Sequence, residues 1–198
     1  MTPITCVFFG RSGSGKGTQA RLLIDKLESM KNGRRVVYAE TGERFRNFVK
    51  GPTYTGGKVL DVMHAGKFLP PFLPIWMWTS LLVDEIKDNT EHLIFDGVAR
   101  QPEEGPVLDG ALQFYGREKP VIILLDVSEK EARARLLKRG RHDDKEEKIT
   151  ERFKAFESGA MPSVRHFQKS PHCSFVSISG ERPIETVHAD ILKALNIK

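Results

Sequence analysis

The sequence predicts an α/β protein, with an open, doubly wound sheet of five parallel strands and helices on both faces. Two observations support this prediction. Short apolar runs alternate with longer amphipathic stretches along the 198 residues. Runs such as Val-Ile-Ile-Leu-Leu at 121–125 also lack the polar alternation of a half-exposed strand. A chain of this length fits one compact domain.

The expected elements alternate along the chain. Strands are expected at residues 4–9, 35–39, 92–95, 121–127 and 174–178. Helical periodicity predicts helices at residues 16–31, 57–65, 72–87, 129–138, 143–168 and 184–195. Such sheets bind their ligands at the carboxyl ends of the strands, where the strand order switches.

Composition narrows the class of protein. Lys and Arg outnumber Asp and Glu by 31 to 26, for a formal charge of +5, which suits an anionic substrate. The arginines lie singly at the ends of expected elements, without interleaved aromatics, and this favours a nucleotide over a nucleic acid. The two cysteines form no CxxC pair, and no apolar run is long enough to span a bilayer. We therefore expect a cytoplasmic protein with no nucleic acid or membrane partner, and a monomer by default, with an oligomer as the alternative.

A phosphate-binding loop follows the first expected strand. Gly10-Arg11-Ser12-Gly13-Ser14-Gly15-Lys16 matches the first seven positions of the P-loop pattern GxxxxGK[ST], and it precedes an expected helix. Glycines let successive backbone N–H groups turn inward around phosphate oxygens, and the helix N-terminus adds partial positive charge. The pattern places the charge of Lys16 on the β- and γ-phosphates of a nucleotide.

The residues after Lys16 point to a family. Gly17 follows the lysine and Thr18 carries the hydroxyl, so residues 10–19 resemble the Gly-x-x-Gly-x-Gly-Lys-Gly-Thr-Gln loop of adenylate kinases and related nucleoside monophosphate kinases. Ser12 stands where adenylate kinases usually have proline. The resemblance covers residues 4–195 and implies reversible, magnesium-dependent phosphoryl transfer from ATP to a nucleoside monophosphate. The acceptor it implies is AMP (ATP + AMP = 2 ADP).

An acidic strand end and several family motifs supply candidate metal and acceptor sites. Asp96 ends an apolar run, which is the place of a Walker B aspartate that holds Mg²⁺ directly or through water. Asp96-Gly97-Val98-Ala99-Arg100 resembles the family's Asp-Gly-Phe-Pro-Arg, and 41–46 and 65–69 resemble two further acceptor-binding segments. The expected magnesium-site residues are Thr18 and Asp96. The expected monophosphate-binding residues are Thr41, Arg46, Lys67, Leu69, Gly97, Arg100, Glu104, Arg141 and Arg152.

The last cluster consists of arginines that resemble the family's lid. Arg135 and Arg139 lie one helical turn apart, and Arg141 and Arg152 follow. Fixed guanidinium groups suit the loose transition state of phosphoryl transfer, whose charge spreads over several oxygens. The expected catalytic residues are Lys16, Arg100, Arg139, Arg141 and Arg152. The expected ATP-binding residues are Gly13, Ser14, Gly15, Lys16, Gly17, Thr18, Arg135, Arg139 and Arg182.

The resemblance also implies an internal organisation. A core of residues 1–39 and 70–198 would carry a helical monophosphate-binding insert at about 40–69 and a short lid at about 139–143. Only Gly140 separates Arg139 from Arg141, which leaves no room for a zinc-binding lid domain, so no structural zinc is expected.

The identity of the accepted base is left open by the residues. Adenylate kinases usually carry glutamine four residues after the motif's arginine, where this chain has Glu104. An ionised carboxylate only accepts hydrogen bonds, so it suits the two adjacent donors of guanine better than adenine. AMP leads on overall pattern, and GMP and CMP or UMP stay open as acceptors. The residues also leave open a P-loop kinase of a non-nucleotide metabolite and a nucleotide-binding module without turnover.

Overall fold

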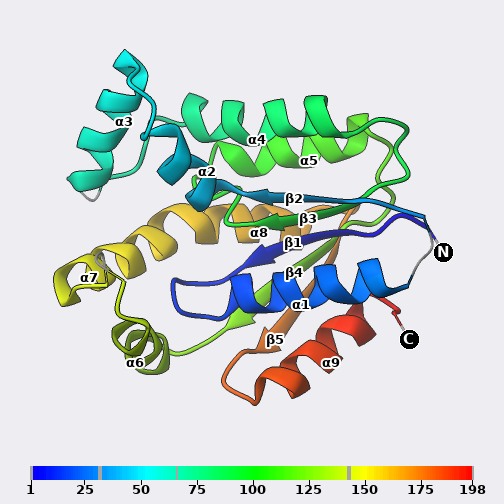
Figure 1. Cartoon of the computed structure of the whole chain (residues 1–198). Helices are drawn as coiled ribbons and strands as arrows, with labels where there is room; N and C mark the ends of the chain where they lie inside the picture. The colour runs from blue at the N-terminus through cyan, green and yellow to red at the C-terminus, as the bar shows by residue number, and fades with distance from the viewer. Residues whose placement is uncertain (1, 31–32, 66, 142–143, 198) are drawn as a thin grey trace.

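The computed structural model describes residues 2–30, 33–65, 67–141 and 144–197. The strands are β1 (Thr5–Phe9), β2 (Val36–Glu40), β3 (His92–Asp96), β4 (Val121–Asp126) and β5 (Ser174–Ser179). They form one parallel sheet in the order β2-β3-β1-β4-β5 (Figure 1). The predicted fold class is therefore confirmed.

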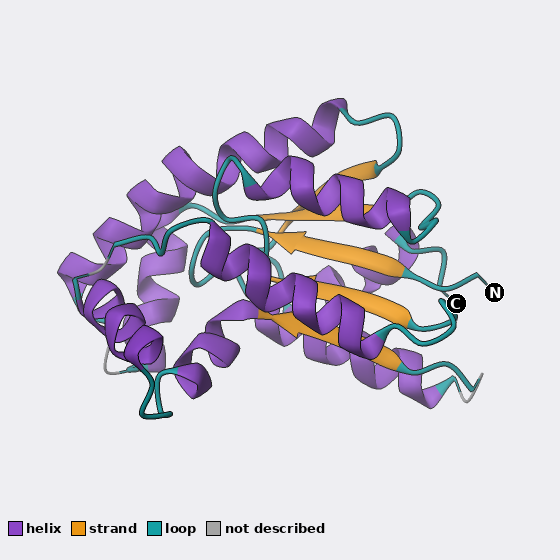
Figure 2. Ribbon diagram, turned by 90° about the horizontal axis from the view of Figure 1, so that it is seen from above, coloured by secondary structure: helices purple, strands orange, loops and turns teal. Residues whose placement is uncertain are grey.

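The helices cover both faces of this sheet (Figures 1 and 2). They are α1 (Lys16–Ser29), α2 (Thr41–Phe48), α3 (Tyr54–His64), α4 (Phe72–Glu85), α5 (Glu104–Phe114), α6 (Glu129–Arg139), α7 (Glu146–Ala155), the π-helix η1 (Phe156–Ala160), α8 (Met161–Lys169) and α9 (Ile184–Ala194). One core packs α1 and α9 on the sheet, and a second packs α4, α5 and α8 on its other face. Within the described ranges, no helix is long and apolar enough to cross a membrane.

Two smaller apolar clusters lie outside these layers. One joins Phe45 of α2, Val59 of α3 and Met77 of α4, so the helices between β2 and α4 have a core of their own. The other joins Leu136 of α6 to Phe153 of α7 and holds this helix pair together. Both clusters lie beside the carboxyl edge of the sheet, where the loops after β1, β3, β4 and β5 come together (Figure 1).

Periodicity did not locate α2 or α5, although α2 falls within the insert expected to be helical, and one helix was predicted as continuous but is interrupted. The helix α2 begins directly at the end of β2, with Glu40 as its N-cap accepting from the backbone N–H of Glu43. The helix α5 contains Gly105, Pro106 and Gly110, which lower helix propensity, but Pro106 falls in the first turn, where no internal N–H bond is lost. The single helix expected at 143–168 is α7, η1 and α8, and the expected start at residue 143 lies outside the described residues.

Candidate active site

The loop between β1 and α1 is shaped by glycines at positive φ. Gly13 has φ of 84°, and a Cβ there would stand 2.5 Å from the carbonyl oxygen of Ala132 in α6, so the loop runs flush against that helix. Gly15 has φ of 94° and forms the N-cap of α1. The backbone N–H of Ser14 donates to the carbonyl of Arg11 at 3.1 Å, closing the turn. A phosphate cradle therefore opens onto the N-terminus of α1.

Lys16 lies where several charges meet. Its Nζ donates to the carbonyl oxygens of Gly10 at 2.7 Å and Arg11 at 3.1 Å, so the ammonium folds over the loop. Burial lowers the pKa of Lys16 to about 8, opposed by the charge of Asp96 and assisted by those of Arg100 and Arg139. The charges of an acidic strand end and of two predicted arginines therefore act on the ammonium of the phosphate loop.

Asp96 ends β3 beside the phosphate loop. It is buried, it lies in register with Phe8 of β1, and its Oδ2 accepts from the hydroxyl of Tyr38 at 3.4 Å. A Cβ on Gly17 would stand 3.4 Å from the same oxygen, so the backbone of α1 passes close to the carboxylate. Thr18, the expected hydroxyl ligand, follows Gly17 in α1 and is exposed. In the described parts of the chain, no group of three or more His, Cys, Asp or Glu side chains gathers as a metal site.

The loop after β3 carries Arg100. Gly97 has φ of 73°, and the guanidinium of Arg100 folds back over it so closely that a Cβ there would displace the guanidinium. Thr41, the first residue of α2, donates from Oγ1 to the carbonyl of Gly97 at 2.5 Å. The predicted acceptor residues Thr41, Gly97 and Arg100 are therefore brought together at one strand end.

The remaining acceptor-side residues lie on the segment between β2 and α4. Arg46 of α2 is 3.7 Å from the carboxylate of Glu40, at the end of β2. Lys67 is exposed. The carbonyl of Leu69 accepts from Nε2 of Gln101 at 2.9 Å, which ties this segment to the loop that carries Arg100.

Three of the four predicted lid arginines bond to one carboxylate. Asp144 has a fully buried side chain whose two oxygens accept from Nε and Nη2 of Arg139, at 2.8 and 2.7 Å. The same carboxylate accepts from Nη1 of Arg152 at 3.0 Å and from the backbone N–H of Arg141 at 3.1 Å. The bonds from Arg139 hold the pKa of Asp144 at about 2. Asp144 thus fixes the guanidinium groups of Arg139 and Arg152, together with the backbone of Arg141, relative to one another.

Two predicted donor-side arginines lie on α6 and just before α9. Arg135 of α6 bonds through Nε to Glu131 at 2.8 Å. Arg182, in the turn between β5 and α9, pairs with Asp190 of α9. Glu181 links the two regions because its carboxylate accepts from the backbone N–H of Ser128, the N-cap of α6, at 2.8 Å.

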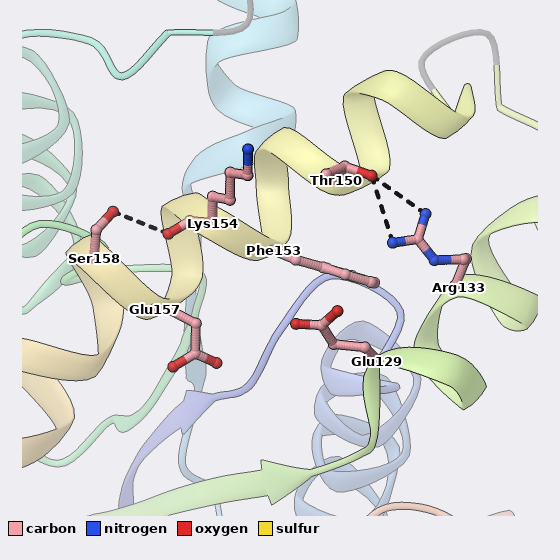
Figure 3. A pocket seen from close by; sticks show the side chains of 7 residues that line it. All are labelled: Glu129, Arg133, Thr150, Phe153, Lys154, Glu157 and Ser158. Carbon is pink, nitrogen blue, oxygen red and sulfur yellow. Dashed lines mark hydrogen bonds between the residues drawn. The ribbon is translucent and has the colours of Figure 1, made fainter.

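Arg11 joins the phosphate loop to the helix that carries Arg152. Its guanidinium is 3.0 Å from Glu157 of η1 and 3.6 Å from Glu129 of α6. It also lies 5.7 Å from the ring centroids of both Phe153 and Phe156. Arg133 covers Phe153 from α6, at 5.3 Å. These helices enclose a shallow hollow of about 510 Å³, lined by Glu129, Arg133, Thr150, Phe153, Lys154, Glu157 and Ser158 (Figure 3).

Comparison with known proteins fits this geometry. A family model described as "Adenylate kinase" matches residues 8–172. Curated proteins named adenylate kinase from Corynebacterium diphtheriae and Phocaeicola vulgatus are 32% and 31% identical to this chain, and the matches span 96–97% of it and 97–98% of those proteins. The one from Bacteroides fragilis is 29% identical, over 98% of both chains. The chain belongs to the adenylate kinase family. It is a nucleotide phosphotransferase, as the resemblance in its motifs indicates.

In this member of the adenylate kinase family, Glu104 points inward. It is 1% exposed, and its carboxylate accepts from Nε1 of Trp78 at 3.3 Å and from the backbone N–H groups of Ala99 and Gln101, both at 3.2 Å. Burial raises its pKa. The side chain expected to meet the acceptor base is bonded within the protein instead.

Two residues of this adenylate kinase family site were not predicted from the sequence. Asp144 is the second of two adjacent acids surrounded by arginines, and that pattern is a usable signal, because a buried acid among arginines becomes their shared partner. Arg11 occupies a variable position of the loop pattern, and only the fold shows that it reaches Glu157, 146 residues further along the chain.

Proposed function

We propose that the chain transfers the terminal phosphoryl group of ATP to a nucleoside monophosphate, reversibly and with Mg²⁺, and that AMP is its preferred acceptor. The observation that carries this proposal is that Asp96 lies beside the phosphate loop that carries Lys16, since it is in register with Phe8 of β1 and its Oδ2 would stand 3.4 Å from a Cβ on Gly17. The charges of Asp96, Arg100 and Arg139 also act on the pKa of Lys16. These groups come from three places in the fold: Lys16 begins α1, Asp96 and Arg100 lie at and just after the end of β3, and Arg139 ends α6.

Each group has a distinct task in this proposal. The loop N–H groups and Lys16 bind the donor phosphates, and Arg100 and Arg46 bind the acceptor phosphate. Arg139 and Arg152, whose guanidinium groups are fixed by Asp144, and Arg141, whose backbone is bound to the same carboxylate, stabilise the negative charge that spreads over the phosphoryl oxygens during transfer. A general base is unnecessary, because the acceptor phosphate is an anion at neutral pH. The preference for AMP is supported by the family and by the names of the relatives.

The residues near the loop fit a magnesium ion bound through water. Asp96 offers a buried carboxylate oxygen beside Gly17, and a carboxylate plus substrate phosphates is the ligand set that Mg²⁺ favours. Asp96 would hold the ion, with Thr18 at the adjoining turn of α1. When bound, Mg²⁺ neutralises charge on the phosphates of ATP.

The test is ADP formation from ATP and Mg²⁺, with AMP, GMP, CMP, UMP and dTMP supplied one at a time. We expect AMP to give the highest kcat/KM. A higher value for another monophosphate would retain the reaction but overturn the AMP assignment. If none of the five accelerates ADP formation, the chain does not phosphorylate nucleoside monophosphates, and the proposed function is wrong.

Two arginine variants test the proposed acceptor site. Arg100→Ala should raise the KM for the monophosphate by at least about tenfold, since a lost charge-assisted hydrogen bond is worth about 1.5–3 kcal/mol, and should leave the KM for ATP within about twofold. Arg165→Ala removes the same charge from an exposed position of α8 and is the matched control. An unchanged KM for the monophosphate in Arg100→Ala would remove this residue from the acceptor site.

A further inference from the structure

The backbone that presents Arg100 is an unusual turn. Ala99 is fully buried with φ of 55°, a left-handed conformation that costs a non-glycine residue about 1–2 kcal/mol and needs support from its surroundings. Neighbouring elements hold the ends of this turn, since Thr41 bonds the carbonyl of Gly97 and Ser163 of α8 bonds the carbonyl of Gln101 at 2.8 Å. The backbone N–H groups on either side of Arg100, those of Ala99 and Gln101, both donate to Glu104.

Three N–H groups converge on the Glu104 carboxylate. Oε2 accepts from the indole of Trp78 and the backbone of Ala99, and Oε1 accepts from the backbone of Gln101. A buried carboxylate is tolerated only when such bonds replace its hydration. A carboxylate has about four acceptor sites, so three of them are already taken by the protein.

We propose that Glu104 is a positioning residue, whose buried carboxylate fixes the turn that presents Arg100 to the acceptor phosphate, and that it does not read the acceptor base. This inference rests on the proposed function for the role of Arg100. Its consequence is that Glu104 influences every monophosphate alike. The glutamate at this position, which on hydrogen-bonding grounds would favour guanine over adenine, then carries no preference between the bases.

The geometry predicts the effect of a single atom change. In Glu104→Gln one carboxylate oxygen becomes an NH₂ group, which faces at least one N–H donor and leaves it without an acceptor. Losing one buried bond of this kind corresponds to about a tenfold change in an equilibrium. We expect the KM for AMP and the KM for GMP to rise together by about tenfold, with their kcat/KM ratio constant within about twofold. The KM for ATP should stay within about twofold of the wild-type value.

The matched control is Glu103→Gln, which makes the same chemical change one residue earlier. Glu103 is exposed and its side chain makes no capping bond to α5. Kinetics of Glu103→Gln should equal those of the wild type. Trp78→Phe is a second variant in case Glu104→Gln does not fold; it removes one of the three donors, keeps an aromatic ring, and should raise the KM for all monophosphates by a smaller factor.

A double-mutant cycle shows whether Glu104 acts through Arg100. Glu104→Gln should cost little further acceptor affinity in an Arg100→Ala background, because the group it positions is gone. Additive losses would mean that Glu104 has a separate role and would overturn the proposal. A change in the AMP to GMP ratio of more than about fivefold in Glu104→Gln would overturn it too, because the residue would then read the base.

Amide hydrogen exchange gives a readout that needs no turnover. At least one of the Ala99 and Gln101 amides, which bond to different oxygens of Glu104, should exchange faster in Glu104→Gln than in Glu103→Gln, while amides of β1 stay protected. Equal protection in the two variants would overturn the positioning role even if the enzyme is active. If the wild type phosphorylates no monophosphate but these amides lose protection, the proposed function fails and the structural part of the inference stands.

Discussion

Replacing Asp144 by asparagine removes one negative charge, keeps the size of the side chain, and disturbs the arginines that meet there. Oδ1 accepts from Nη2 of Arg139 and Nη1 of Arg152, and Oδ2 accepts from Nε of Arg139 and the N–H of Arg141. An asparagine keeps only one acceptor oxygen. In either orientation of its amide, two of these hydrogen bonds are lost and an NH₂ group faces their donors.

The magnitude follows from the type and exposure of these bonds. A hydrogen bond to a charged group is worth about 1.5–3 kcal/mol. The side chains of Arg139 and Arg152 are 37% and 26% exposed, so water replaces part of what they lose. We expect the free energy of unfolding to fall by about 2–3 kcal/mol. Since the arginines also lose their fixed orientation, kcat should fall by about 10- to 100-fold.

Urea unfolding and steady-state kinetics of Asp144→Asn measure both effects. The control is Glu151→Gln, an exposed residue of α7 paired with Lys148 at 3.1 Å, which should change stability by less than about 0.5 kcal/mol. If Asp144→Asn matches this control in stability, or retains full kcat, the carboxylate is not the organising partner of the arginines.

The pH dependence of stability provides an independent check. Asp144 has a pKa of about 2 in the folded protein against an ordinary value of 3.8, so its stabilisation is complete above pH 3.8 and is lost as the pH falls through 2. The difference in stability between wild type and Asp144→Asn should therefore be constant at neutral pH and shrink below about pH 4. A difference that stays constant down to about pH 2 would contradict the assignment.

Two further predictions concern the phosphate loop and the π-helix. Because the pKa of Lys16 is about 8, kcat/KM for ATP should fall as the pH rises through 8 and the ammonium is lost, and Lys16→Arg, whose guanidinium stays charged, should remove this decline from whatever activity remains. An unchanged profile in that variant would assign the decline to another group. In Gly159→Ala the new Cβ would stand 2.5 Å from the carbonyl oxygen of Arg100, so stability should fall by about 1–3 kcal/mol and the KM for the monophosphate should rise. Gly110→Ala, in an exposed part of α5 with nothing within 4 Å, should instead raise the free energy of unfolding by about 0.5–1 kcal/mol, and equal effects in the two variants would refute the packing argument.

Those features of the fold that depend on local pattern were predictable. Apolar runs located all five strands, and glycine spacing before Lys16 located the phosphate loop, because both signals lie within a few neighbouring residues. The helix α5 was missed because Gly105 and Pro106 lower its intrinsic propensity, while the burial of Leu108 and Leu112 against the sheet stabilises it. Tertiary packing overrides local propensity in such a segment.

In the candidate active site, too, local motifs were predictable and contacts that depend on tertiary packing were not. The motifs placed Arg100 and Arg139 near the loop, and in the structure the charges of both lower the pKa of Lys16. The direction of Glu104 could not be predicted, since it depends on an indole donor 26 residues away in the sequence. The choice of Asp144 as the arginines' partner depends likewise on how α6 and α7 pack. The substrate contacts of the predicted residues stay predictions that the proposed variants test.

The π-helix η1 sets a rotational phase between the two ends of a long helical segment. An α-helix turns by about 100° per residue, so one extra residue accommodated in a wider turn rotates everything beyond it by about that angle. Phe153, before η1, faces α6, and Phe167, after η1, faces the sheet and α5. Without the extra residue these two side chains could not both be buried where they are. A helical wheel drawn through residues 146–169 as one regular helix therefore misassigns one of the two buried faces. Deleting a single residue within η1 would turn Phe167 out of the core while leaving the sequence almost unchanged.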